Sequence, residues 1–426
     1  MSTSKIRLVR SAPDPLGLYI RAGRIDRDLQ SFITAGSATF TGVVFEAKRV
    51  ERQKELLTLV LEKGLDAILD PQTQAMATVG GYVTGMDCLS WSNKRKQEIE
   101  DISTPPQQRQ MADEIAQFAK RFGFTQVLSP THLISGPNDP WLEVDIACAL
   151  ALRSALEKNG AGNIQLHYSL AVNYELFRTP TLRATVLDKI RRVPLDGLWL
   201  KIDGRGSDLS PTGITRYGDA AVDFQQLGVP IIADHAGGLM GLGLLAFGTV
   251  GGLAHGITLG ERFDASSWRK KSIGTHFSPT TRIYIPQIDF MLKRVEAEKF
   301  FESGGGKARS AFGCRDTSCC PRGIIDTLQV PARHFLYQRT RQIAGLSQIP
   351  ESIRPTQYLE EYLRPASDLA IVAAKLDLPD GLVKKVAKQA KRLNDLRTTL
   401  GPYARERRDA SFARYPITRV ARNGRD

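Results

Sequence analysis

Residues 41–70 read "TGVVFEAKRVERQKELLTLVLEKGLDAILD". The β-branched run at 41–47 predicts a strand, and the stretch 52–64, which a glycine closes, predicts a helix. The next apolar run, at 65–75, predicts a second strand that leads into a turn. Strand, helix and strand in this order form the unit of a parallel sheet, because parallel strands need a long crossover connection. The stretch therefore predicts an α/β fold.

The same alternation continues along the chain. Two strand patterns are already given, and six more follow, most with a helical pattern after them: 124–134, 163–176, 195–206, 229–238, 251–260 and 307–314. Eight strands that alternate with helices predict a TIM-type (β/α)₈ barrel over residues 41–313. A doubly wound open sheet shares the alternation but usually has fewer strands. A long segment after the second strand, 78–103, could cover the mouth of such a barrel.

The rest of the chain divides into three parts by composition. We expect an N-terminal extension at 1–40, a Cys/His segment with a helical subdomain at 314–383, and a basic C-terminal region at 384–426. The last of these holds thirteen Lys/Arg against four Asp/Glu and so supplies +9 of the net charge of +13. Such a charge suits a nucleic-acid partner, although a solvated helix explains it equally well.

No segment of the sequence predicts contact with a membrane. The chain has no apolar run long enough to span one, and its first residues lack the apolar core of a secretory signal. An odd number of cysteines, five, also argues against a disulfide framework. We therefore expect a cytoplasmic protein.

Three aspartates stand at the ends of predicted strands: Asp70, Asp203 and Asp234. In TIM barrels the active site lies at the carboxyl ends of the strands, where a partly desolvated carboxylate can act as nucleophile or base. The alternative is that each aspartate only caps a helix or a loop. Because three of them share this setting, we predict that they are catalytic. The neighbouring polar residues and glycines are predicted to bind substrate: Gln72, Lys201, His235, Gly237 and Gly238.

A cluster of metal-binding residue types follows the predicted eighth strand. Cys314, Cys319, Cys320 and His334 match the ligand set of a closed structural zinc site. A catalytic thiol, or thiols without a ligand, are the alternatives. We predict that a structural Zn²⁺ ties the C-terminal segment to the barrel.

The barrel with "CRDTSCCPRG…ARHFLYQR" at 314–339 resembles the tRNA-guanine transglycosylase superfamily. The strand-end aspartates and the basic C-terminus add to the resemblance, which covers most of 40–360 in architecture. The family's Asp-Ser-Gly-Gly and Phe-Asp-Cys-Val signatures are absent, and "LDPQTQ" at Asp70 is the closest stand-in for the first. These departures favour a divergent member, such as the branch that acts on DNA.

The resemblance implies an exchange of guanine in nucleic acid, DNA rather than tRNA, for a 7-deazaguanine base. It implies that an aspartate attacks C1′ to form a covalent ester and that a second acid assists the base. The missing motif does not identify the nucleophile; we expect Asp234 in that role and Asp70 as acid and base, with Asp203 as the substitute for either. Tyr82 and Trp91 could stack on a base, or pack in the core. The sequence leaves open whether a helper ATPase or nuclease subunit is a further partner.

Two other functions remain open at this stage. Histidines at three strand ends, His167, His235 and His255, could hold a metal ion together with Asp203 or Asp234 in a hydrolase or lyase. A degenerate barrel could also bind nucleic acid without catalysis, but carboxylates at the mouth would then oppose its polyanionic ligand.

Overall fold

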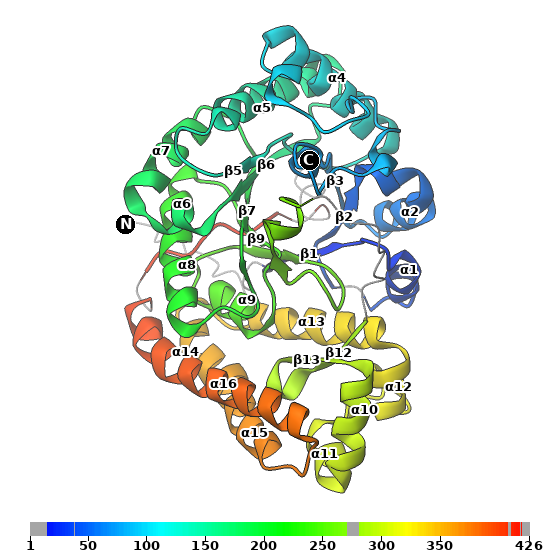
Figure 1. Ribbon diagram of the computed structural model, residues 1–426, viewed down its shortest axis with the longest axis vertical. Helices are drawn as coiled ribbons and strands as arrows, with labels where there is room; N and C mark the ends of the chain where they lie inside the picture. The colour runs from blue at the N-terminus through cyan, green and yellow to red at the C-terminus, as the bar shows by residue number, and fades with distance from the viewer. Residues whose placement is uncertain (1–14, 38, 271–280, 408–409, 418, 420–426) are drawn as a thin grey trace, which may run out of the picture.

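A computed structural model describes residues 15–37, 39–270, 281–407, 410–417 and 419 (Figure 1). Eight parallel strands pair in a closed ring, since β4 bonds to both β3 and β6. The ring contains, in order, β1 (Gly17–Arg21), β2 (Gly42–Glu46), β3 (Asp66–Asp70), β4 (Gln126–Leu128), β6 (Gln165–Val172), β7 (Gly197–Ile202), β9 (Ile231–Asp234) and β10 (Gly252–His255). The predicted TIM-type (β/α)₈ barrel is confirmed.

The predicted eighth strand was wrong. Residues Gly305–Phe312 form a helix, α11, and the missing strand is β1, inside the segment 1–40 that was expected to be an extension. The run "KARSAF" is rich in residues with low strand propensity, whereas "GLYIR" is apolar and contains an aromatic and a β-branched residue. Since β1 pairs with β10 on one side and β2 on the other, the barrel strands span 17–255.

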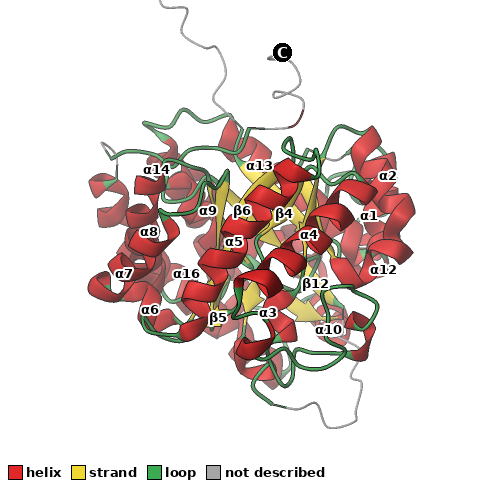
Figure 2. Cartoon of the chain, turned by 90° about the horizontal axis from the view of Figure 1, so that it is seen from above, coloured by secondary structure: helices red, strands yellow, loops and turns green. Residues whose placement is uncertain are grey.

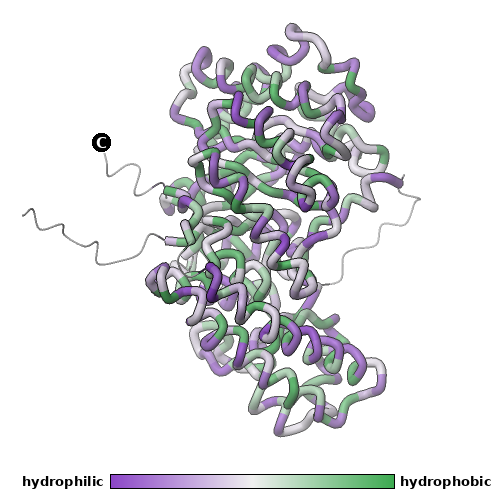
Figure 3. Tube along the Cα trace, turned by 90° about the vertical axis from the view of Figure 1, so that its left-hand side faces the viewer, coloured by the Kyte–Doolittle hydropathy of each residue, from purple (hydrophilic) through white to green (hydrophobic). Residues whose placement is uncertain are grey.

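Helices surround the strands, as Figure 2 shows. They are α1 (Asp26–Thr34), α2 (Lys54–Glu62), α4 (Pro105–Phe122), α5 (Pro140–Lys158), α7 (Pro180–Ile190), α8 (Pro211–Asp223) and α9 (Gly238–Ala246). Both ends of α4 carry local signals: Thr104 and Gln107 form a capping box, and Gly123 ends the helix at φ 72°. In Figure 3 the outer helices alternate hydrophobic and hydrophilic residues, as helices with one buried face do.

The inside of the barrel is filled by one layer of apolar side chains. It contains Tyr19, Val44, Ile68, Leu128, Trp199, Ile232 and Ala254. Because side chains alternate along a strand, the residues two positions further on also point inward. On five strands these are charged, and they form the floor of the barrel mouth: Arg21, Glu46, Asp70, Lys201 and Asp234.

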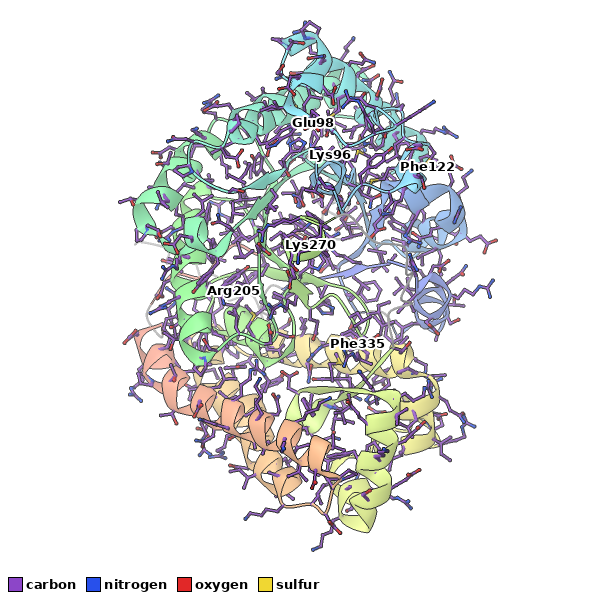
Figure 4. The ribbon with its side chains drawn as sticks, viewed as in Figure 1. Lys96, Glu98, Phe122, Arg205, Lys270 and Phe335 are labelled. Carbon is purple, nitrogen blue, oxygen red and sulfur yellow. The ribbon has the colours of Figure 1, made fainter. Side chains whose placement is uncertain are left out.

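The segment after β3 lies against the mouth. The Trp91 indole donates to the Pro71 carbonyl at 3.1 Å and is 4% exposed, so Trp91 is a core residue and not a stacking platform. The Gly80 amide donates to the Trp268 carbonyl at 2.8 Å, which joins this segment to the one after β11 (Arg262–Phe263). In the view of Figure 4, Lys270 lies over the centre of the strand ring. The Tyr82 hydroxyl bonds to the Asp87 carboxylate.

The C-terminal part packs on one side of the barrel, at the bottom of Figure 1. A hairpin of β12 (Arg282–Ile285) and β13 (Phe290–Lys293) precedes α10 (Arg294–Ser303). The remaining helices are α12 (Ile324–Gln329), α13 (Pro331–Ser347), α14 (Arg354–Gln357), α15 (Arg364–Ala374) and α16 (Asp380–Glu406). Helix α16 buries Val386, Leu393 and Leu400, so much of the predicted basic region is a packed helix. Among the described residues no helix is long and apolar enough to cross a membrane.

Candidate functional site

Arg21 joins two of the predicted catalytic aspartates at the barrel mouth. Its Nε and Nη2 donate to the Asp234 carboxylate at 2.8 and 2.6 Å, and its Nη1 donates to Asp70 Oδ2 at 2.8 Å. Burial favours the neutral form of Asp234, but the charges of Arg21 and Lys201 outweigh it and hold the Asp234 pKa well below its usual range. The same two cations lower the pKa of Asp70 against its burial. Both carboxylates are therefore ionised at neutral pH.

Lys201 lies on the other side of Asp234. Its Nζ donates to Gln74 Oε1 at 2.7 Å and lies 3.6 Å from Asp234 Oδ2. Burial, and then repulsion by Arg21, lower the Lys201 pKa. Gln74 is held in this orientation because its Nε2 donates to Thr131 Oγ1 at 2.9 Å and to the Ser169 carbonyl at 3.1 Å. Arg21 and Gln74 were both missed by the sequence analysis.

The residues after the two aspartates take up unusual backbone conformations. Gln72 and His235 have φ of 64° and 58°, a region that non-glycine residues rarely occupy. Both turn their backbone amides toward the preceding carboxylate: Gln72 donates to Asp70 Oδ1 at 2.9 Å and His235 to Asp234 Oδ1 at 3.0 Å. The strained turns thus help to fix the carboxylates of the site.

The His235 ring is a neutral hydrogen-bond acceptor. Its Nδ1 lies 3.0 Å from the Gly260 carbonyl, which can only accept, so the proton is on Nδ1 and the lone pair is on Nε2. Burial lowers the pKa of His235 to about 3. Nε2 lies 4.0 Å from Asp234 Oδ1, so two acceptors face the same space. The His235 side chain is 20% exposed, so its Nε2 suits a hydrogen-bond donor of a ligand.

Three predicted site residues are engaged elsewhere. Asp203 accepts from the Ala265 amide at 2.7 Å and pairs with Arg269 at 2.5 Å, so it fixes a loop and does not contact Arg21. A side chain on Gly237 would meet Glu261, whose Oε1 accepts from the Gly238 amide at 3.2 Å. The start of α9 is therefore occupied by the protein's own carboxylate, and the expected free amides are not available to a substrate.

The buried cluster around Arg339 explains this arrangement. Arg339 Nε donates to Glu261 Oε1 at 2.8 Å, and its Nη1 donates to Tyr284 Oη at 2.6 Å and to Asp289 Oδ1 at 3.2 Å. Asp289 in turn accepts from the Leu239 amide at 2.8 Å. Arg339 on α13 thus neutralises the two carboxylates that cap α9 and ties the C-terminal part to the barrel.

The three strand-end histidines do not converge. His167 Nδ1 accepts from the Trp199 indole at 2.8 Å, and His255 packs edge-on against Phe335 with ring centroids 5.6 Å apart. Among the described residues, the only group of three or more possible metal ligands is the Cys/His cluster. The predicted histidine metal site inside the barrel therefore has no support in this structure.

The Cys/His cluster can bind a metal ion such as zinc. The ligand atoms of Cys314, Cys319, Cys320 and His334 all lie within 4.8 Å of one another, and all four residues are buried. The two adjacent sulfurs are 3.6 Å apart, and each lies 3.4 Å from His334 Nδ1. A tetrahedral zinc ion with usual bond lengths places sulfur atoms about 3.8 Å apart and sulfur about 3.5 Å from nitrogen. Both adjacent cysteines therefore fit the ligand set.

Surrounding groups prepare this cluster for a cation. His334 Nε2 lies 3.2 Å from the Tyr284 carbonyl, which fixes the proton there and leaves the Nδ1 lone pair toward the sulfurs. Gln338 Nε2 lies 3.6 Å from Cys319 Sγ, and Thr327 Oγ1 lies 3.6 Å from Cys320 Sγ. The cluster follows a helix, α11, and not the barrel strand that was predicted.

Comparisons with known proteins add little beyond the fold. No protein-family model matches the chain, and no curated protein matches it significantly. Among solved structures, a GH10 xylanase from Bispora sp. MEY-1 has a TM-score of 0.37 at 12% identity, over 56% of this chain and 82% of its own. A putative phosphonomutase from Burkholderia cenocepacia has a TM-score of 0.35 at 16% identity, over 57% and 87%. A type I 3-dehydroquinate dehydratase from Clostridium difficile has 0.36 at 9%, over 59% and 88%. Similarities this weak do not bear on the reaction.

Proposed function

We propose that this chain is a transglycosylase that replaces guanine in nucleic acid, in DNA rather than tRNA, with a 7-deazaguanine base. The observation that carries the proposal is the pair Asp70 and Asp234, which one guanidinium holds ionised at the barrel mouth. Base exchange with a covalent intermediate needs a carboxylate that is ionised before the substrate binds. The resemblance of 314–339 to the transglycosylase superfamily, and a cluster that fits zinc, support the same assignment.

Asp234 is the proposed nucleophile. One of its oxygens attacks C1′ of the target nucleotide, the bond from C1′ to the guanine nitrogen breaks, and the electron pair leaves with guanine. Arg21 and the His235 amide hold the carboxylate in one orientation. Its side chain has no exposed surface, whereas that of Asp70 is 15% exposed. The covering segments must therefore open before C1′ reaches Asp234.

Lys201 is the proposed proton donor. Asp70, the expected acid, is ionised because nearby cations lower its pKa, so it lacks the proton that the leaving base needs. The Lys201 ammonium has a lowered pKa and releases its proton more readily than an ordinary lysine. It protonates the departing guanine, and as an amine it then takes the proton of the incoming 7-deazaguanine when that base attacks C1′. The exchange thus returns Lys201 and Asp234 to their first states.

His235 and Asp70 are proposed to hold the base. Guanine carries adjacent N–H groups, which match the acceptor His235 Nε2 and the exposed edge of Asp70. A base with acceptors at these positions leaves buried acceptors unpaired, at a cost of about 1–3 kcal/mol for each.

A second candidate rests on Lys201 alone. A buried lysine with a lowered pKa beside a carboxylate is also the arrangement that forms an imine with a carbonyl substrate. Such an enzyme would be a lyase, and its covalent bond would form at Lys201 Nζ with loss of water. The two candidates therefore differ in the residue that carries the adduct.

The test is to locate that adduct. The protein is incubated with guanine-containing single-stranded DNA or tRNA and labelled guanine, and exchange and denaturant-stable complexes are measured. We expect exchange and an adduct on the Asp234 peptide, both lost in Asp234→Asn and kept in Asp196→Asn, a matched change at the other end of the barrel, where Asp196 pairs with Arg153. Borohydride-trapped adducts on Lys201 with carbonyl compounds, without exchange, would support the lyase instead. Nucleic-acid binding with neither reaction would leave the non-catalytic alternative.

A further inference from the structure

A cleft lined by cations opens beside the barrel mouth. Its volume is about 1010 Å³, and its walls come from the loops after β1 and β2, from the segment after β3 and from the end of α4. The cationic residues of this cleft, which we call the basic cleft, are Arg24, Lys48, Arg49, Arg52, Lys94 and Arg121. Only two acidic residues, Glu51 and Asp87, line it. A neighbouring cavity of about 400 Å³ shares Arg24, Arg49 and Arg52 and extends it.

Half of these cations have no acidic partner. Arg24, Arg52 and Lys94 are exposed, and none of them forms an ion pair within the part of the chain that the structure describes. Lys96, by contrast, pairs with Glu98 at 2.8 Å in the same segment, and both are labelled in Figure 4. Unpaired cations that face one cleft repel one another, so the cleft is suited to a ligand with several negative charges.

One wall of the basic cleft lies one strand away from Asp70. Glu46, which pairs with Lys48 at 3.6 Å and Arg49 at 3.0 Å, lies directly opposite Asp70 in the strand register. The Lys48 amide also donates to Gln72 Oε1 at 3.2 Å. A polyanion in the cleft therefore passes within one strand of Asp70.

The cleft also offers apolar surface. Val83 is 43% exposed and lines the wall with Phe118. The Arg121 guanidinium lies 5.0 Å from the Phe122 ring, which Figure 4 labels beside α2, and this contact holds a cation at the rim. Cations that follow a backbone and apolar groups that receive bases are the two components of single-strand binding sites.

We infer that the basic cleft binds the sugar–phosphate backbone of an unpaired nucleic-acid strand next to the base that enters the barrel. This inference rests on the proposed function. DNA and RNA strands share the phosphodiester chemistry, and the experiment separates them. A strand is favoured over a free nucleotide because the cations are spread over three separate loops and one helix end. The exposed lysines of α16 are the competing surface, since they supply part of the charge of the basic C-terminal region.

The test compares two triple variants of the full chain. Arg24→Gln/Arg52→Gln/Lys94→Gln removes the unpaired cations of the cleft, and Lys384→Gln/Lys388→Gln/Lys391→Gln removes the same charge from α16. Binding of fluorescent single-stranded DNA and RNA is measured by anisotropy from about 0.05 to 0.5 M salt. Three lost phosphate contacts reduce the magnitude of the slope of log K against log salt by about 2. If the two proteins bind equally at 1 M salt, the variant therefore binds roughly 100-fold more weakly at 0.1 M salt. We expect this loss in the cleft variant alone.

The outcomes separate the cleft from the function. Equal losses in the two variants, or a loss in the α16 variant alone, overturn the inference whether or not base exchange occurs. A cleft variant that loses binding while the wild-type protein forms no adduct supports the cleft and contradicts the transglycosylase. If the wild-type protein binds neither DNA nor RNA, both the proposed cleft and the proposed transglycosylase are contradicted. The ratio of DNA to RNA affinity identifies the strand.

Discussion

Arg21, the last residue of β1, donates to both carboxylate oxygens of Asp234, the last residue of β9, at 2.8 and 2.6 Å. These strands are not neighbours, because β10 lies between them, and the bond to Asp70 on β3 likewise passes over β2. The Arg21 guanidinium therefore bridges two carboxylates that lie on opposite sides of β1, each two strands away. The ionisation of both aspartates depends on it.

Replacing Arg21 with glutamine is expected to raise the pKa of Asp234. The loss of an opposite charge at this distance shifts a carboxylate by about 1–3 pH units. The acid limb of the pH–rate profile for base exchange should move to higher pH by that amount. The variant should therefore lose less of the wild-type rate at pH 8 than at pH 6. An unchanged acid limb would show that Asp234 is not the group that must be ionised.

The same pair makes folding stability depend on pH. The pKa of Asp234 is lowered in the folded state, below the value near 3.9 of an unfolded chain. The ionised pair therefore stabilises the protein fully above about pH 4, and this contribution is lost as the pH falls further. Urea unfolding at pH 3 to 7 should show a smaller fall for Arg21→Gln than for the wild-type protein. Parallel curves would contradict this linkage.

Lys201→Met is expected to lower the rate of base exchange by about 10²–10⁴, the usual contribution of a general acid. The Lys201 ammonium donates the proton in the proposed mechanism, and methionine keeps the volume without a proton. Added small amines should restore part of the rate, with a dependence on their pKa. Gln74→Leu, which removes the 2.7 Å bond to Nζ, should lower the rate less and shift the basic limb of the profile. If Lys201→Met left the exchange rate unchanged, another group would have to be the acid.

Much of this site could be predicted from local patterns. Asp70, Lys201 and Asp234 each follow a run of apolar residues, and the carboxyl ends of buried parallel strands meet at one face. Cys314, Cys319, Cys320 and His334 lie within 21 residues of one another, so their residue types alone indicated a metal site.

The missed residues depend on contacts that are distant in sequence. β1 is only five residues long, and it is fixed by pairing with β10, where Gly17 lies opposite Gly252. No local pattern indicates that pairing, so Arg21 was left in an extension. The contact of Asp203 is likewise distant in sequence, because its partner Arg269 comes from a loop 66 residues further on. A carboxylate that fixes a loop and one that pairs with Arg21 at the barrel mouth follow the same apolar pattern.

The Cys/His cluster is expected to hold about one zinc ion per chain. Cys319→Ser and His334→Ala should both lose it, whereas Cys148→Ser, a buried cysteine on α5 outside the cluster, should keep it. Loss of a structural metal ranks with changes above about 4 kcal/mol, so the melting temperature should fall by roughly 5 °C or more. Metal content by mass spectrometry and thermal unfolding are the two measurements. Metal retained in both cluster variants would place it elsewhere.

His235 is expected to act as a neutral acceptor throughout the working pH range. Its pKa of about 3 predicts that no limb of the pH–rate profile between pH 5 and 8 belongs to it. His235→Leu should raise KM for the guanine-bearing strand by about 2- to 13-fold, the cost of one lost hydrogen bond. His235→Asn should recover part of this, because asparagine tolerates the φ of 58° and offers an acceptor oxygen. His235 would act in another way if His235→Asn raised KM as much as His235→Leu. The same would follow if the wild-type profile had a limb near pH 6.5 that vanished in both variants.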